Sequence, residues 1–142
     1  MEYTINEIQD QIIEEFSVFD DWMDKYEYLI ELGRDLETYD PKYKTDKYLI
    51  EGCQSRVWVY GIVENGVIRY FADSDAIITK GMISLLIRTL SGQKPVDIAD
   101  AELYFIETIG LKDNLSLTRS NGLASMVKQM KIMAAENLAC NG

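Results

Sequence analysis

One cysteine of the chain, Cys53, has neighbours that suit chemistry on its thiol. It stands in the stretch Glu51-Gly52-Cys53-Gln54-Ser55-Arg56-Val57-Trp58, directly ahead of an apolar, β-like run. Gly52 leaves the approach to the thiol open, and Arg56 is close enough in sequence to favour a thiolate, the nucleophilic form of cysteine. The alternative is a buried structural cysteine, which is the commoner role of a free thiol. Because the neighbouring Glu, Gln, Ser and Arg are mostly surface types, residue chemistry leaves both interpretations open.

Other nucleophile and metal systems are limited by composition. The chain has no histidine, which excludes Cys-His and Ser-His-Asp systems and every metal site that uses imidazole. Cys53 and Cys140 are too few for the disulfide framework of a small secreted domain, so reduced thiols are expected. Asp73 and Asp75 could form an acid and base pair or a metal site, but aspartates at a strand end are more often turn formers and caps. Lys80 could form a Schiff base with pyridoxal phosphate, yet nothing around it supplies a phosphate cup or a partner for the ring nitrogen.

Three motifs carry a family resemblance. Gly52-Cys53-Gln54-Ser55-x-Val57-Trp58 resembles the signature of the SufE family of cysteine-desulfuration proteins. Two further stretches resemble family motifs in the family's order: Ala72-Asp73-Ser74-Asp75-Ala76 with Lys80-Gly81 after it, and Arg119-Ser120-Asn121-Gly122-Leu123. Together the three span most of the chain. One departure is Leu117, where relatives often carry a proline, and it bears on partner choice rather than on the sulfur chemistry.

The resemblance implies a sulfur acceptor, a stoichiometric carrier and desulfurase activator rather than an enzyme. Cys53 would take persulfide sulfur from a SufS-like, pyridoxal-phosphate-dependent cysteine desulfurase and pass it to an iron–sulfur cluster-assembly scaffold complex. The chain itself would need no cofactor, because the pyridoxal phosphate belongs to the partner desulfurase. Arg56 and Arg119 are candidates for stabilising anionic sulfur, since a guanidinium is always charged. The loop around the thiol would be supported by Gly52, Gln54, Ser55 and Asp75.

Two other functions remain open at this stage. One is a docking or regulatory module of a desulfurase in which Cys53 carries no sulfur. The other is an iron–sulfur cluster scaffold of the related assembly type. A scaffold needs several thiolate or imidazole ligands around iron, and one loop cysteine with one tail cysteine cannot form such a site within the chain.

Length and charge set further limits. The 142 residues suit a single domain covering 1–142, and 14 basic against 24 acidic residues give a formal charge of −10. This charge disfavours nucleic acid and anionic membrane surfaces and would suit a basic patch on a protein partner. The start, Met1-Glu2-Tyr3-Thr4-Ile5, lacks the features of a signal or transit peptide, and the apolar runs are too short to span a bilayer. A cytoplasmic protein is expected.

The elements that position the thiol follow from hydrophobic spacing. Thr4 and Glu7 form a capping-box pattern ahead of a helix that runs to about Phe16. Asp20 or Asp21 can cap a second helix, which Gly33 would end in a left-handed turn. Residues 34–48 follow no period and are expected to form a long polar connection that leads to the cysteine loop. Its charges are expected to be solvated, and contact with the protein that delivers the sulfur is the alternative.

The second half of the chain predicts a hairpin and more helices. Strands at 57–63 and 67–72 flank Asn65-Gly66, a pair favoured in type I′ turns. Residues 76–79 are expected to add a short third strand, and apolar spacing predicts helices at 80–90, near 95–109 and from Ser120 to Leu138. The expected fold is therefore α+β, a small antiparallel sheet of about three strands covered by helices on one face, as in SufE and IscU-like proteins.

Overall fold

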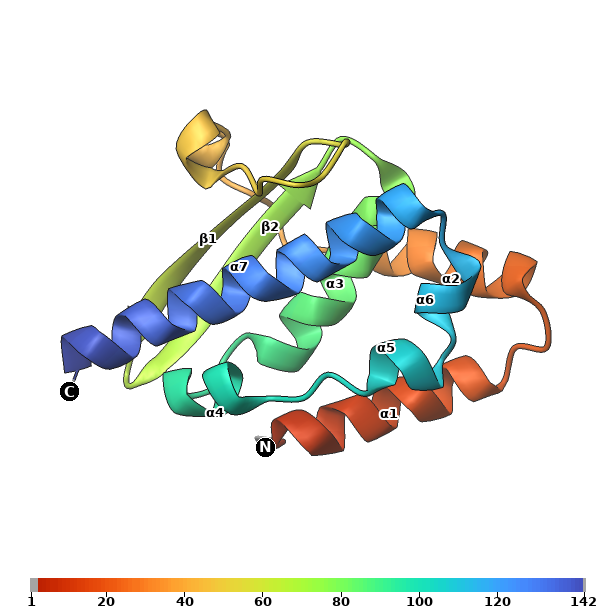
Figure 1. Cartoon of the computed structure of the whole chain (residues 1–142), viewed down its shortest axis with the longest axis horizontal. Coiled ribbons are helices and arrows are strands. Elements are labelled where there is room, and N and C mark those ends of the chain that lie inside the picture. The colour runs from red at the N-terminus through yellow and green to blue at the C-terminus, as the bar shows by residue number, and fades with distance from the viewer. Residues whose placement is uncertain (1–2, 142) are drawn as a thin grey trace.

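The sheet of the molecule is a two-stranded antiparallel hairpin that lies to one side of the helices (Figure 1). The computed structural model describes residues 3–141, without the side chains of residues 112 and 139–141, so a prediction about the thiol of Cys140 lies outside the described residues. β1 (Val57–Glu64) pairs with β2 (Val67–Ser74) in a register that runs from Val57 opposite Ser74 to Glu64 opposite Val67. Asn65 and Gly66 both have positive φ, 52° and 81°, as a type I′ turn requires, so the predicted hairpin is confirmed.

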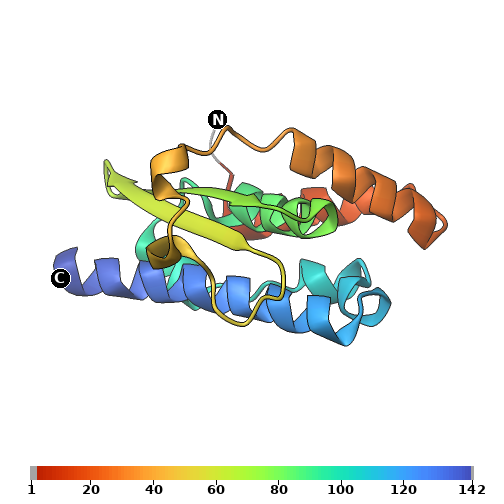
Figure 2. The same ribbon diagram turned by 90° about the horizontal axis from the view of Figure 1, so that it is seen from above.

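The helices pack against one face of this hairpin and against one another. They are α1 (Ile5–Ser17), α2 (Trp22–Arg34), α3 (Ile77–Leu90), α4 (Pro95–Asp100), α5 (Phe105–Thr108), α6 (Leu111–Asn114) and α7 (Leu117–Asn141). α3 is the central helix, because it contacts β2, α1, α2 and α7. α7 runs beside the hairpin in both views (Figures 1 and 2), and the Tyr70 hydroxyl of β2 donates a 2.7 Å hydrogen bond to the Met130 carbonyl of α7.

Tyrosines from the connection between α2 and β1 cover the other face of the hairpin. The connection contains two short 3-10 helices, η1 (Pro41–Tyr43) and η2 (Asp46–Tyr48). The ring of Tyr43 stacks on Tyr60 of β1 with centroids 3.8 Å apart, and Tyr39 and Tyr48 meet the same ring at its edge. The charged residues of this stretch are exposed, as expected, but its tyrosines pack against the sheet, which the lack of a regular period did not predict.

The predicted third strand is also wrong, and the sheet has two strands. Residues 77–79 form the first turn of α3, which begins at Ile77 instead of Lys80. A short apolar run fits strand and helix equally well by periodicity, and here the helix places Thr79, Met82 and Ile83 in the interior while Ile77 stays 63% exposed. The α+β class itself is confirmed.

Two helix ends differ from the sequence predictions. α2 continues through Gly33, which is not left-handed, and ends at Arg34. A Cβ on Gly33 would lie 2.9 Å from the backbone nitrogen of Gly81, so this glycine permits the close approach of α2 and α3. α7 begins at Leu117, three residues before the predicted cap Ser120, and the Ser116 hydroxyl accepts the N–H of Arg119 at 3.2 Å.

Among the described residues, no helix is both long and apolar enough to cross a membrane.

Candidate functional site

The loop that carries Cys53 is closed at its base by backbone hydrogen bonds. The N–H of Ile50 donates to the carbonyl of Val57 at 2.8 Å, so the residues between them form a closed loop ahead of β1. Gly52 within it has φ +92°, a left-handed conformation that other residues adopt only with strain. A Cβ at Gly52 would lie 2.4 Å from the Ser125 Oγ of α7, so the loop lies directly against this helix. Position 52 therefore requires glycine, because its backbone is left-handed and the neighbouring helix leaves no space for a side chain.

Asp75 and Ser74 anchor the far side of the loop through the backbone of Arg56. The N–H of Arg56 donates to the Asp75 carboxylate at 3.0 Å, and the Ser74 hydroxyl donates to the Arg56 carbonyl at 2.8 Å. The Asp75 N–H reaches the same carbonyl at 3.2 Å. Asp75 thus occupies the supporting position that the motif suggested, and it contacts the loop backbone rather than the thiol.

The Cys53 thiol is half-buried and faces the first turns of α7. Its Sγ lies 3.5 Å from the carbonyl oxygen of Gly122, an arrangement in which a protonated thiol donates a weak hydrogen bond. Burial raises the pKa of the Cys53 thiol above its ordinary value, because the thiolate loses hydration there. Burial therefore favours the protonated form of the thiol, which is the less reactive one. The arginine at position 56 does not reverse this effect, although its place in the sequence suggested that it would favour a thiolate.

A cavity of about 430 Å³ opens beside the thiol. The thiol loop, the start of α3 and the start of α7 line it together, through Cys53, Gln54, Ser55, Thr79, Met82, Ser116, Thr118, Arg119, Gly122 and Met126. Arg119 is thus brought to the thiol by the fold, although the two residues lie far apart in the chain. Arg56 does not line the cavity, and its side chain is exposed. A role for Arg56 in stabilising anionic sulfur stays a prediction without geometric support.

Comparison with known proteins gives the family. The family model for the SufE domain, described as an Fe-S metabolism associated domain, matches residues 10–134. The chain belongs to the SufE family. An uncharacterised SufE-like protein of Rhizobium etli is 41% identical over 127 residues, which cover 86% of each chain. The sulfur acceptor protein CsdE of Escherichia coli is 34% identical over 113 residues, covering 78% of this chain and 77% of CsdE.

A solved structure supports the SufE fold independently. The solution structure of a hypothetical protein from Thermus thermophilus superposes with a TM-score of 0.77 and covers 93% of this chain and 96% of the other. The two sequences are 20% identical. This likeness shows that the arrangement of helices around a small hairpin is shared, and it says nothing of activity.

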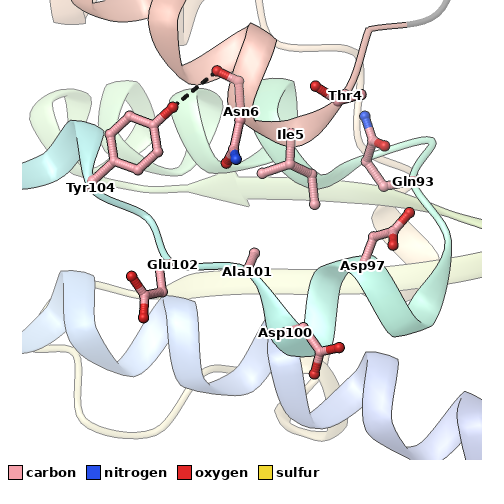
Figure 3. A pocket seen from close by; sticks show the side chains of 9 residues that line it. All are labelled: Thr4, Ile5, Asn6, Gln93, Asp97, Asp100, Ala101, Glu102 and Tyr104. Atoms are coloured by element: carbon pink, nitrogen blue, oxygen red, sulfur yellow. Dashed lines mark hydrogen bonds between the residues drawn. The ribbon is translucent and has the colours of Figure 1, made fainter.

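Another cavity of this SufE chain, about 470 Å³ in volume, lies far from the thiol in the sequence (Figure 3). It is formed by the start of α1 and the segment around α4, where the Tyr104 hydroxyl donates to the Asn6 carbonyl at 3.1 Å. Its charged lining residues are Asp97, Asp100 and Glu102. Although it is somewhat larger than the cavity beside Cys53, it contains no thiol and no cation among its lining residues.

Asp73 and Lys80 have a structural role near the site. The Asp73 carboxylate bridges the ammonium groups of Lys44, at 2.7 Å, and Lys80, at 3.3 Å. Burial opposes ionisation of Asp73, but hydrogen bonds from Lys44 and the Ser74 N–H, with Lys80 nearby, outweigh it and hold the pKa of this carboxyl below its ordinary value. Asp73 thereby ties the connection ahead of the thiol loop to the start of α3. Within the described residues there is no cluster of three or more potential metal ligands.

Several lining residues were not identified from the sequence. The strand predicted at 76–79 concealed the place of Thr79 in the first turn of α3, and Met82 is predicted only as part of the apolar face of helix 80–90. Ser116 and Thr118 lie ahead of the helix start predicted at Ser120, whereas α7 begins between them, at Leu117. Hydrophobic spacing predicts Met126 on the inner face of the last helix, and only the fold shows that this face also borders the cavity of the thiol.

The pH dependence of Cys53 alkylation tests the burial of the thiol. We expect the rate with iodoacetamide to reach half its maximum at a higher pH in the folded protein than in urea, because burial raises the pKa of the thiol and only the thiolate reacts. Since the folded state keeps this proton to higher pH, the free energy of unfolding should also fall as the pH rises past the ordinary thiol pKa. The reaction can be followed by mass spectrometry on tryptic peptide 48–56. An equal or lower midpoint in the folded protein would contradict the burial described above.

Proposed function

We propose that this SufE chain accepts persulfide sulfur on Cys53 from a pyridoxal-phosphate-dependent cysteine desulfurase, and that it stimulates the desulfurase by removing its product. The observation that carries the proposal is the place of the thiol: half-buried on a glycine-anchored loop, at the edge of a cavity that also holds Arg119. Family membership and the sulfur acceptor CsdE among its relatives support the same function.

The transfer step follows thiol–disulfide exchange. The Cys53 thiolate attacks the outer sulfur of the donor persulfide, a new S–S bond forms on Cys53, and the S–S bond of the donor breaks. The donor cysteine leaves as a thiolate, and the transferred sulfur keeps its proton, so the step needs no external oxidant or reductant. Its rate depends on the ionisation of the attacking thiol and on the quality of the leaving group, and no general acid is required. This explains how a chain without histidine can do this work.

The partner must also make the thiol reactive. Because burial favours the protonated form of the Cys53 thiol, docking has to expose the thiol or bring positive charge near it before attack. The acidic surface of a chain with charge −10 suits a basic patch on the desulfurase. We place the partner in the SufS-like class and the final recipient in a cluster-assembly scaffold complex, both in the cytoplasm.

Mass spectrometry tests the proposal directly. The chain is incubated with a desulfurase and cysteine, trapped with iodoacetamide and digested with trypsin. Trypsin places Cys53 in peptide 48–56 and Cys140 in peptide 132–142, so the two thiols are resolved in one experiment. We expect one additional sulfur atom on peptide 48–56 and none on peptide 132–142, and only when cysteine is present. Extra sulfur on the second peptide alone would overturn the assignment to Cys53.

A further inference from the structure

The cavity beside Cys53 differs in charge from the rest of this acidic chain. The chain carries 24 acidic residues, yet Arg119 is the one charged residue among those that line the cavity in the described part of the structure. Arg119 also has no salt bridge to a carboxylate of the described residues. The contrast with the cavity at Asp97, Asp100 and Glu102 is direct, because that cavity has three carboxylates and no cation (Figure 3). The Cys53 cavity therefore suits an anion.

A buried hydroxyl also opens onto this cavity. Thr79 is only 5% exposed and lines the cavity from the first turn of α3. Within the described part of the chain its hydroxyl makes no side-chain hydrogen bond, and no fully enclosed polar side-chain atom there lacks a partner. The Thr79 hydroxyl must therefore be accessible from the cavity itself. A buried polar group in this position is best satisfied by a polar ligand or water.

The start of α7 adds a third favourable feature for an anion. Ser116, Thr118 and Arg119 line the cavity, so the N-terminal end of this 25-residue helix faces it. The N–H of Arg119 already donates to the Ser116 hydroxyl, so the N–H groups left for a ligand at this helix start are those of Leu117 and Thr118, and the helix dipole favours negative charge there. Together with a guanidinium, this end of α7 forms a binding site suited to a carboxylate.

The apolar lining of the cavity suits the remainder of a small thiol. Met82 and Met126 are fully buried and present polarisable thioethers beside the Cys53 thiol. The volume of about 430 Å³ is within the range in which cavities hold small molecules, roughly 300–1,000 Å³. A small ligand that carries both a carboxylate and sulfur would match the guanidinium and the thioethers that line the cavity.

We infer that this cavity binds carboxylate-bearing low-molecular-weight thiols, and that such thiols can discharge the sulfur carried by Cys53. The discharge of sulfur rests on the proposed function, because that function loads the sulfur onto Cys53. The binding of a carboxylate in the cavity does not depend on it. In the discharge step the small thiolate attacks the outer sulfur of the Cys53 persulfide and forms a new S–S bond. The S–S bond to Cys53 breaks, Cys53 leaves as a thiolate, and the transferred sulfur keeps its proton. The products are a small persulfide and the free acceptor protein.

The carboxylate site can be tested on the free protein without a desulfurase. Iodoacetate and iodoacetamide alkylate the same thiol and differ in charge, and peptide 48–56 reports both products. We expect Arg119→Gln to lower the ratio of the iodoacetate rate to the iodoacetamide rate at least about tenfold, since a charge-assisted hydrogen bond is lost. Lys128→Gln removes the same charge from an exposed position on the same helix, outside the cavity, and should leave the ratio unchanged. If both variants lowered this ratio equally, the preference for iodoacetate would come from the overall charge of the protein. The proposed carboxylate site would then be wrong.

The discharge is tested on a persulfide made chemically, by treating a Cys53 mixed disulfide with sulfide. The probes are 3-mercaptopropionate, which carries a carboxylate, and 2-mercaptoethanol, which does not, compared at equal thiolate concentration. We expect Arg119→Gln to slow discharge to 3-mercaptopropionate at least about tenfold and to leave 2-mercaptoethanol unaffected. An equal loss with both probes would overturn the inference. Failure of the desulfurase to load Cys53 would instead contradict the proposed function, and this experiment would not be affected.

Discussion

Cys53→Ser is expected to abolish stimulation of the desulfurase and return its turnover to the rate of the desulfurase alone. A serine hydroxyl stays protonated near neutral pH and cannot replace a thiolate in attack on a persulfide sulfur. The substitution changes one atom in a half-buried position, so the loop should keep its close approach to Ser125 and its hydrogen bond to Asp75. The measurement is cysteine consumption or sulfide release by the desulfurase with increasing amounts of each variant.

Cys140→Ser is the matched control, because it makes the same change to the other cysteine of the chain. This variant should stimulate as well as the original protein. Binding of Cys53→Ser to the desulfurase, measured by calorimetry, should persist, which separates loss of chemistry from loss of docking. If Cys53→Ser still stimulated fully, the chain would act as a docking or regulatory module without covalent sulfur, and the proposed function would be wrong.

Local signals in the sequence predicted the elements whose structure depends on near neighbours. The Asn65-Gly66 pair predicted the hairpin, since few residues tolerate two successive positive φ angles. The capping box at the start of α1 is present as predicted, with the Glu7 N–H donating to Thr4 Oγ1 at 3.1 Å and the Thr4 N–H donating to Glu7 Oε1 at 2.9 Å. The assignment of residues 76–79 failed because tertiary burial, not local preference, decides between strand and helix for so short a run.

The site was only partly predictable for a similar reason. Of the residues that the motifs suggested, the fold brings Cys53, Gln54, Ser55 and Arg119 to one cavity, while Arg56 does not line it. Arg56 directly precedes Val57, whose side chain is fully buried, and successive side chains of an extended segment point to opposite faces. Nearness in sequence therefore does not bring Arg56 to the cavity, and the place of Thr79 in its lining depends on where α3 begins.

The position of α3 depends in turn on Gly81, and Gly81→Ala should destabilise the fold strongly. A Cβ at this position would lie 2.3 Å from the carbonyl oxygen and 2.8 Å from the carbonyl carbon of Leu29 in α2. These are backbone atoms, so no side chain can rotate away and one helix must shift. Overpacking of a close contact costs about 3 kcal/mol, while alanine regains only about 1 kcal/mol of helix propensity over glycine. We expect a net loss of about 2 kcal/mol or more in the free energy of unfolding, measured by urea denaturation.

Gly92→Ala provides the control for this prediction, since Gly92 has φ +81° but no atom within 4 Å of the added Cβ. Its cost should be limited to backbone strain of about 1–2 kcal/mol, and it should leave the alkylation rate of Cys53 unchanged. Gly81→Ala should alter that rate, because a shift of α3 moves Thr79 and Met82, which form one wall of the Cys53 cavity. A Gly81→Ala protein as stable as the original would contradict the close packing of α2 on α3. The same result would imply that the geometry of the thiol cavity does not depend on this contact between two glycine-containing helices.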